Sequence, residues 1–291
     1  MPTVSVVITC YNYGRYLKAS LASVLDQTYR DFDVIVVDDG STDNTPAIMQ
    51  GYAADGRVSY IRQENAGQPK AKNRGIRQSN GEFVAFLDAD DLWMPDKLEK
   101  QMTLFDDPHV GVVYARRKWI NQDGEEISGD ERRLWRGNVL DRIFVDNFIC
   151  FSSAVIRRSV LDQVGFFDET LPMGIDYDLW IRVAARSEFV FVDEPLVKYR
   201  TGHANLSRNT LKRYDCAQRI MRKSLSDPLL RDRFAWYVPR LAWADTWSNM
   251  AVYFAAQGSR REALRYFGKA FVMMPVYPQL VKRALKCLLL P

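Results

Sequence analysis

The chain has 291 residues, of which 47% are hydrophobic and 26% are charged, as is ordinary for a folded globular protein of about two domains. Its net charge of +4 is too small to indicate nucleic-acid binding, although it can help to attract anions. The four cysteines are far apart and lack the paired spacing of a disulfide framework or a zinc site, which favours reduced thiols in a cytosolic protein.

Strands and helices alternate along the first hundred residues. The β-branched runs Val4–Thr9 and Val34–Val37 predict strands, and Val58–Ile61 predicts a third. Helices are predicted between them, one with an apolar face from Leu17 to Leu25, one opened by Pro46, and a Lys- and Arg-bearing one that ends near Ile76. This alternation predicts a mostly parallel sheet with helices on both faces. We expect no signal peptide because a strand begins at Val4, and no apolar run reaches membrane-spanning length.

The apolar run Phe83–Leu87 ends in three carboxylates, Asp88, Asp90 and Asp91. Such a run is typical of a buried parallel strand, and ligands of open α/β sheets bind just outside the carboxyl ends of such strands. Side chains alternate along an extended chain, so Asp88 and Asp90 share a side and a cation would relieve their repulsion. An oxygen-only ligand set favours Mg²⁺ or Mn²⁺ over zinc, with phosphate oxygens of a substrate completing the shell. The alternative is a solvated acidic turn before the helix that begins near Pro95.

The alternation of predicted strands and helices becomes less regular from about residue 107. Val110–Tyr114 and Phe189–Val192 are predicted strands that continue the same sheet, and helices are predicted near Leu140 and Leu179. From about Leu211 onward the chain is predicted to be entirely helical.

Within this helical part, residues 251–275 are similar to one tetratricopeptide-like helix pair. One pair cannot form a solenoid, so we expect a helical appendage packed on the core. The resulting division is residues 1–106 for the regular α/β half, 107–210 for the less regular half of the same domain, and 211–291 for the helical region.

Five stretches resemble, in family order, the inverting family 2 glycosyltransferases, which use nucleotide sugars and have the Rossmann-like GT-A fold. They cover about residues 1–205 and are Val4–Asn12, Val34–Asp43, Asn65–Gly75, Phe86–Pro95 and Asp176–Arg182. The resemblance implies an enzyme that moves a sugar, a hexosyl or N-acetylhexosaminyl group, from a UDP-sugar or another nucleotide sugar. The implied acceptor is a hydroxyl of a glycan or of a lipid-linked molecule in polysaccharide biosynthesis.

The resemblance also implies a nucleotide site. Thr9, Tyr11 and Asp39 match positions that hold the base in relatives. Asp39 can accept from a base N–H at the end of its strand, and Tyr11 can stack. The alternative for Asp39 is a turn residue before Gly40. Lys72 matches a position at which relatives meet the diphosphate, and its alternative is a solvated charge on a helix face.

For the metal, Asp88, Asp90 and Asp91 match the family's metal and ribose motif. Asp90 or Asp91 is expected to contact Mn²⁺ or Mg²⁺, and Asp88 is expected to serve the ribose or an outer shell. His203, in a polar loop after Arg200, matches a histidine that approaches the metal or the diphosphate in relatives.

For catalysis, Asp176 matches the family's base. A carboxylate there would take the proton of the acceptor hydroxyl as this attacks the anomeric carbon, which inverts that centre. Asp178, Trp180, Arg182 and Arg200 match family positions near the acceptor. The alternatives are an N-cap for Asp178 and core packing for Trp180.

At the C-terminus, Val281, Leu285, Leu288 and Leu289 share a helix face beside Lys282, Arg283 and Lys286. Residues 278–290 therefore predict either a contact with an acidic membrane surface or a helix packed on its neighbours. The expected location is the cytoplasm, with a possible peripheral position on the inner face of the plasma membrane, and no nucleic-acid partner is expected.

Other classes fit less well. An aspartyl phosphohydrolase would carry its acidic motif on the first strand, and a dinucleotide oxidoreductase would show a glycine fingerprint there. A nucleotidylyltransferase would need a glycine- and arginine-rich first loop, which Tyr11–Gly14 does not supply. A degenerate transferase that acts as a scaffold through its helical tail is the remaining alternative. The nucleotide base, donor sugar, acceptor and linkage stay open at this point.

Overall fold

The computed structural model describes residues 2–202 and 209–288. The chain folds into two compact units. The sheet unit comprises Met1–Val139 and Phe148–Asn205, and the helical unit comprises Leu140–Asn147 and Leu206–Pro291. The short segment Leu140–Asn147 thus folds with the C-terminal helices and not with the strands that flank it in sequence.

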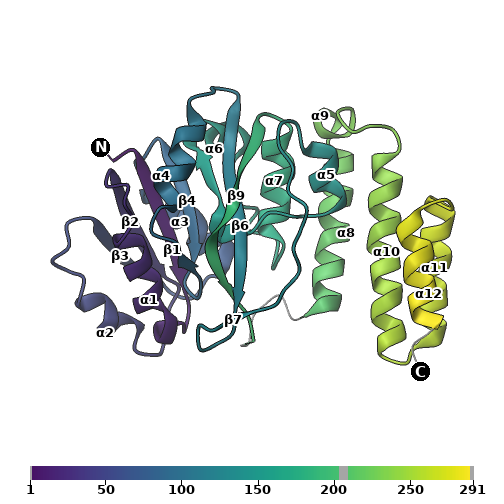
Figure 1. The fold of residues 1–291 in the computed structure, drawn as a ribbon, viewed down its shortest axis with the longest axis horizontal. Coiled ribbons are helices and arrows are strands. Elements are labelled where there is room, and N and C mark those ends of the chain that lie inside the picture. The colour runs from purple at the N-terminus through teal and green to yellow at the C-terminus, as the bar shows by residue number, and fades with distance from the viewer. Residues whose placement is uncertain (1, 203–208, 289–291) are drawn as a thin grey trace. The chain divides into compact units, whose positions relative to one another are not determined.

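The sheet unit is built on one mixed sheet with the strand order β3-β2-β1-β4-β8-β6-β9-β5, to which β7 adds at β6 (Figure 1). The first four strands in the chain, β1 to β4, run parallel, as does the pair of β6 and β9. The short β8 runs antiparallel between β4 and β6, and β5 runs antiparallel to β9. The strands are β1 Val4–Cys10, β2 Phe32–Asp38, β3 Val58–Arg62, β4 Phe83–Asp88, β5 Leu92–Trp93, β6 Val110–Ile120, β7 Glu126–Ile127, β8 Val155–Arg157 and β9 Glu188–Arg200.

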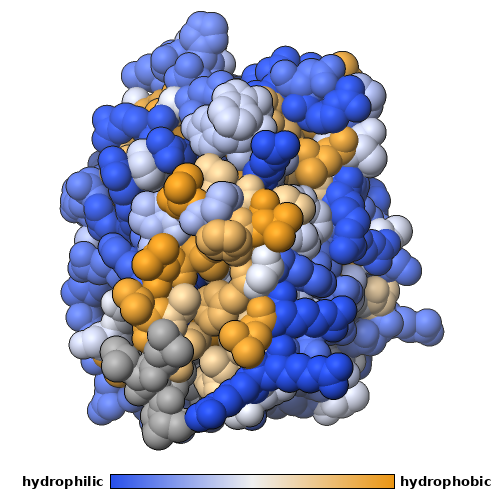
Figure 2. All heavy atoms as spheres, turned by 90° about the vertical axis from the view of Figure 1, so that its right-hand side faces the viewer, coloured by the Kyte–Doolittle hydropathy of each residue, from blue (hydrophilic) through white to orange (hydrophobic). Residues whose placement is uncertain are grey.

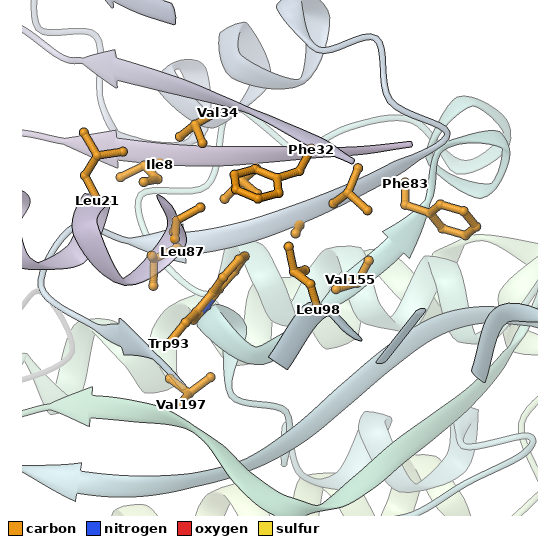
Figure 3. Close-up of a cluster of buried hydrophobic side chains, with 14 of the residues drawn as sticks. Ile8, Leu21, Phe32, Val34, Phe83, Leu87, Trp93, Leu98, Val155 and Val197 are labelled. Atoms are coloured by element: carbon orange, nitrogen blue, oxygen red, sulfur yellow. The ribbon is translucent and has the colours of Figure 1, made fainter. Parts of the chain in front are cut away.

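Helices cover both faces of this sheet because successive strand residues alternate between faces. Val34 and Val36 pack on the side of Leu21 in α1, whereas Ile35 and Val37 pack with Ala71 of α3. Figure 3 shows part of the first cluster, which extends to Trp93 and Val197. The predicted sheet with helices on both faces is therefore confirmed. The helices of this unit are α1 Gly14–Leu25, α2 Thr45–Gln50, α3 Gln68–Gln78, α4 Lys97–Met102, α6 Arg158–Val164 and α7 Ile175–Ala184, with the 3₁₀ turns η1 Thr103–Phe105 and η2 Phe151–Ser153.

Close packing of α3 on the sheet depends on Gly75. A Cβ at this position would lie 2.4 Å from Val7 Cγ1 and 3.3 Å from Val37 Cγ2, two branched side chains in the middle of the sheet. We expect Gly75→Ala to lower the free energy of unfolding by about 1–3 kcal/mol, because overpacking outweighs the better helix propensity of alanine. Urea unfolding followed by circular dichroism measures this.

The matched control is Gly268→Ala in α11, where a Cβ meets nothing within 4 Å. Helix propensity alone acts there, so the variant should be more stable by up to about 1 kcal/mol. Equal effects of the two substitutions would contradict the close-packing explanation.

The helical unit consists of α5 Leu140–Val145, α8 Thr210–Ser226, α9 Pro228–Arg231, α10 Val238–Ala256, α11 Arg260–Met273 and α12 Pro278–Leu288. The helices α10 and α11 form a pair joined at Gly258, whose φ of 74° is the left-handed conformation that ends many helices. This agrees with the expected helical C-terminal region. Among the described residues, no helix is long and apolar enough to cross a membrane.

A buried ammonium group lies in the core of the sheet unit. Lys97 Nζ is 2.6 Å from Gln101 Oε1 and 3.9 Å from the centroid of the Trp93 ring. Burial lowers the pKa of Lys97 well below its usual value. Between the lowered pKa and the usual one, the unfolded chain binds more protons than the folded chain, so stability rises with pH in this window.

We therefore expect that, as the pH rises toward the usual lysine pKa of about 10.4, the free energy of unfolding increases by up to about 1.4 kcal/mol per pH unit more in the native protein than in Lys97→Met. Urea titrations of both proteins at several pH values measure the difference, and titrations common to both cancel. Parallel pH profiles would show that Lys97 stays charged in the core.

Candidate active site

The carboxyl ends of β1, β2 and β4 meet at one edge of the sheet. Thr9 stands opposite Val37 on one side and Asp88 on the other. The residues that follow each strand, Tyr11, Asp39 and Asp90, therefore leave the sheet at this same edge. Ligands of open α/β sheets bind at such an edge.

Asp39 is buried, with 4% of its surface exposed, and it holds the loop that precedes α3. Its Oδ1 accepts from Gln63 Nε2 at 2.7 Å and from the Ala66 N–H at 2.8 Å, and its Oδ2 accepts from the Gly67 N–H at 2.9 Å. Each carboxylate oxygen can accept two hydrogen bonds. Among the described residues, Oδ2 thus keeps one acceptor position, enough for one N–H of a base.

The neighbouring Asp38 has a different task. It is fully buried, accepts from Tyr60 Oη at 2.6 Å, and accepts from the Ser41 N–H at 2.8 Å. These bonds shape the turn after β2, which borders an open hollow at Gly40.

That hollow has a volume of about 520 Å³ and is lined by Gly40, Arg62, Gln63, Glu64 and Asn65. Its size lies within the range of small-molecule sites. Tyr11, which is 46% exposed at the end of β1, offers a ring face for stacking. This side of the edge can therefore hold a planar, hydrogen-bonding group.

At the end of β4, Asp88 forms an ion pair with Lys72 of α3. The Nζ–Oδ1 distance is 2.6 Å, and the ammonium lies 3.9 Å from the centroid of the Phe151 ring. The Lys72 side chain is only 3% exposed, so it is not a solvated charge on the helix face. In this arrangement Lys72 neutralises Asp88 and fixes its direction.

Asp91 turns inward and is 1% exposed. It accepts from the Ser152 hydroxyl and from the Arg200 N–H, the latter at 2.8 Å. Burial, with the charges of Asp90 and Asp88 added, raises the pKa of Asp91 well above its usual value. Burial is also the largest cause of the raised pKa of Tyr13, and the charges of Asp90 and Asp88 raise it further. Three carboxylates thus lie close to one another at the end of β4.

Two further residues fix this acidic turn. The Ser152 Oγ that donates to Asp91 also accepts from the Asp88 N–H at 3.2 Å. Arg200, itself 5% exposed, donates from Nε to the Asp90 carbonyl at 2.7 Å. Ser152 and Arg200 therefore act on Asp88–Asp91 as positioning residues.

The donor atoms at this edge fit a divalent cation of the Mg²⁺ or Mn²⁺ class. No cluster of three or more His, Cys, Asp or Glu side chains suited to a metal exists among the described residues. Asp90 is partly exposed, whereas Asp91 is buried and Asp88 is paired with Lys72. One carboxylate completed by phosphate oxygens is a usual way of holding Mg²⁺ in nucleotide sites. His203 lies outside the described residues.

Asp176 is partly exposed in the first turn of α7, two residues after Gly174, whose φ is 71°. Two anchors hold this helix in the sheet unit. Trp180 is completely buried and packs on Phe151, which in turn stacks on Phe86 of β4 with ring centroids 4.9 Å apart. Trp180 therefore acts through packing.

The second anchor is the loop of residues 164–169, which side chains of two helices hold by hydrogen bonds. From α7, Arg182 donates to the carbonyls of residues 164, 165 and 166 and pairs with Asp178 at 2.9 Å. From α3, the Asn73 amide accepts from the Phe167 N–H and donates to the Phe167 carbonyl, both at 2.9 Å. Asp178 lies inside the helix, so Gly174 and not Asp178 is the N-cap.

Sequence reasoning missed the residues that position the site. No sequence motif marks Ser152, Phe151 or Asn73 as functional, although Asn73 lies inside one of the five stretches that resemble the family. A run of alternating strand residues could not reveal them, because Ser152 contacts Asp88 and Asn73 contacts Phe167, which lie 64 and 94 residues away in the chain.

Comparisons with known proteins agree with this geometry. The profile of "Glycosyl transferase family 2" matches residues 5–165. An uncharacterized glycosyltransferase of Rickettsia felis is 32% identical over 197 residues, which are 68% of this chain and 33% of that protein. This chain thus spans about a third of the length of that relative.

Two solved structures share the fold. TarS of S. aureus, residues 1–349, superposes with a TM-score of 0.71 at 20% identity, covering 98% of this chain and 88% of that one. The mannosyltransferase PcManGT of Pyrobaculum calidifontis, in complex with GDP-Man and Mn²⁺, gives a TM-score of 0.64 at 20% identity and covers 99% of this chain and 87% of that one. TarS has also been solved with UDP-GlcNAc.

Proposed function

This chain belongs to glycosyl transferase family 2, and from that premise we propose that it is an inverting, metal-dependent enzyme of polysaccharide biosynthesis. It moves a hexosyl or N-acetylhexosaminyl group from a nucleotide sugar to a hydroxyl of a glycan or lipid-linked acceptor. A UDP-sugar is the preferred donor, and the neighbours solved with UDP-GlcNAc and GDP-Man support a nucleotide sugar in general.

The observation that carries the proposal is the common edge of β1, β2 and β4, where a hollow next to the end of β2 and an acidic turn after β4 lie on either side of β1. In this proposal Asp39 accepts from the base, Tyr11 stacks on it, and Thr9 lines the floor. Asp88, directed by Lys72, faces the ribose. Residues 1–106 then form the half that binds the nucleotide sugar, and 107–210 supply the acceptor side.

Asp90 would hold the cation, Mn²⁺ or Mg²⁺, and His203 is proposed as a further ligand. When bound, the cation supplies positive charge that stabilises the departing diphosphate. Asp91 keeps the turn in place through Ser152 and Arg200, so it is a positioning residue in this proposal.

Asp176 is the proposed catalytic base. Its carboxylate takes the proton of the acceptor hydroxyl while the hydroxyl oxygen bonds to the anomeric carbon and the bond to the diphosphate breaks. A single displacement inverts the anomeric centre. Asp178 and Arg182 hold the helix that carries Asp176, and Trp180 secures it in the core. The proposed location is the cytoplasm.

A panel of UDP-, GDP- and TDP-sugars tests this function. We expect slow hydrolysis of one UDP-sugar with Mn²⁺, and proton NMR should show a first-formed sugar of the opposite anomeric configuration. No turnover of any nucleotide sugar, together with no nucleotide binding, would leave the interaction scaffold as the better interpretation.

A further inference from the structure

The helical unit exposes an unusual amount of apolar surface on α11 and α12. Six large apolar side chains on these helices and in the turn between them are between 52% and 81% exposed, namely Leu264, Phe271, Val272, Val276, Val281 and Leu285. We call this set the α11–α12 apolar patch. Isolated exposed apolar residues are normal, but neighbouring ones over two consecutive helices are not.

Helical spacing explains why these residues share the outward side. On α11, Phe271 and Val272 lie seven and eight residues after Leu264, about two helical turns, and Val281 and Leu285 lie four apart on α12. The inward side is already used, since Ala270 and Leu280 are buried against Ala244 of α10. The view onto these helices in Figure 2 shows hydrophobic side chains gathered on one face, with hydrophilic side chains along its borders.

The charge of the helical unit is opposite to that of the sheet unit. The helical unit holds 17 of the 40 Lys and Arg but 7 of the 36 Asp and Glu, which gives net charges of +10 for it and −6 for the sheet unit. Arg261 and Lys282 are exposed on the same helices as the patch. After Asp245 the sequence has one acidic residue, Glu262, and it pairs with Arg265 at 3.3 Å.

We propose that the α11–α12 apolar patch docks on an acidic lipid surface. An apolar face bordered by Arg and Lys is the composition that lies in the plane of a membrane interface, with the apolar side chains below the anionic headgroups. A second copy of the chain is a poorer occupant, because two units of +10 would repel each other across the contact. The proposal does not depend on the transferase function.

Vesicle flotation tests the proposal with the full chain. We expect binding to phosphatidylcholine vesicles that contain about one third phosphatidylserine, weaker binding at high salt, and little binding to phosphatidylcholine alone. Phe271→Gln with Val281→Gln should weaken binding about tenfold or more, because both apolar contacts are lost. The matched control pair is Ile127→Gln with Leu211→Gln, two apolar residues exposed by 41% and 43% outside α11 and α12, and it should bind as the native protein does.

A second pair, Arg261→Gln with Lys282→Gln, tests the charge contribution separately. Each basic side chain near an acidic surface contributes about fivefold, so binding to acidic vesicles should fall about 25-fold. If circular dichroism shows that the apolar variants fold poorly, this charge pair still tests the proposal. The proposal is overturned if the native protein does not float with acidic vesicles, or if either variant floats as well as the control. It is equally overturned if sedimentation shows a dimer that the patch variants disperse without any vesicle binding.

Discussion

Asp176→Asn is expected to abolish nearly all sugar transfer while the protein still binds its nucleotide. Asparagine keeps the size and position of the side chain at the start of α7 but cannot take a proton from the acceptor hydroxyl. General-base catalysis contributes about 10²- to 10⁴-fold, so kcat should fall by that factor. The measurement is the initial rate of transfer with the donor that the panel identifies, alongside the affinity for its nucleoside diphosphate.

A carboxylate on a neighbouring helix provides the control for this experiment. Asp162 is exposed on α6, and Asp162→Asn should leave kcat within about twofold of the native value. If Asp176→Asn kept full activity, the base would have to be sought on another element. If nucleotide affinity fell together with kcat, the residue would belong to the sugar donor site.

Asp90→Asn should remove the effect of Mn²⁺ on nucleotide binding. The carboxylate of Asp90 is partly exposed at the edge, whereas Asp91 is buried and its carboxylate accepts from Ser152 and the Arg200 backbone. With Mn²⁺ present, we expect the variant to bind UDP about tenfold or more weakly than the native protein, a loss of about 1.4 kcal/mol or more. Isothermal titration with UDP measures this.

In EDTA the native protein and Asp90→Asn should bind UDP with the same low affinity, because the difference resides in the cation. The control is Asp106→Asn, an exposed carboxylate that follows η1, and it should behave as the native protein in both conditions. An Asp90→Asn variant that retained its full response to Mn²⁺ would rule out the proposed metal contact.

Much of the fold follows from local patterns. The β-branched runs Val4–Thr9 and Val34–Val37 are almost entirely buried, on both faces of the sheet. A parallel strand that is buried on both faces can be recognised in the sequence as a continuous apolar run. The three-residue β8 is different. It is too short to show a period, and its place between β4 and β6 is set by pairing with strands more than 40 residues away on one side and 70 on the other.

The candidate site, too, could be predicted from the sequence only in part. Which carboxylates stand at the edge could be predicted, because the chain direction of parallel strands fixes where β1, β2 and β4 end. What each carboxylate does depends on partners from distant segments. The motif alone does not tell which of Asp90 and Asp91 contacts the metal. Their roles can be distinguished in the structure because Ser152 and the Arg200 N–H hold the Asp91 side chain inward.

Diffraction from crystals soaked with UDP and Mn²⁺, recorded with the anomalous signal of manganese, tests the central proposal most directly. We expect one manganese peak within about 2.5 Å of an Asp90 carboxylate oxygen, diphosphate oxygens on the same ion, and the uracil at Asp39. UDP bound away from the β1–β2–β4 edge, or a manganese peak without contact to Asp90, would contradict it.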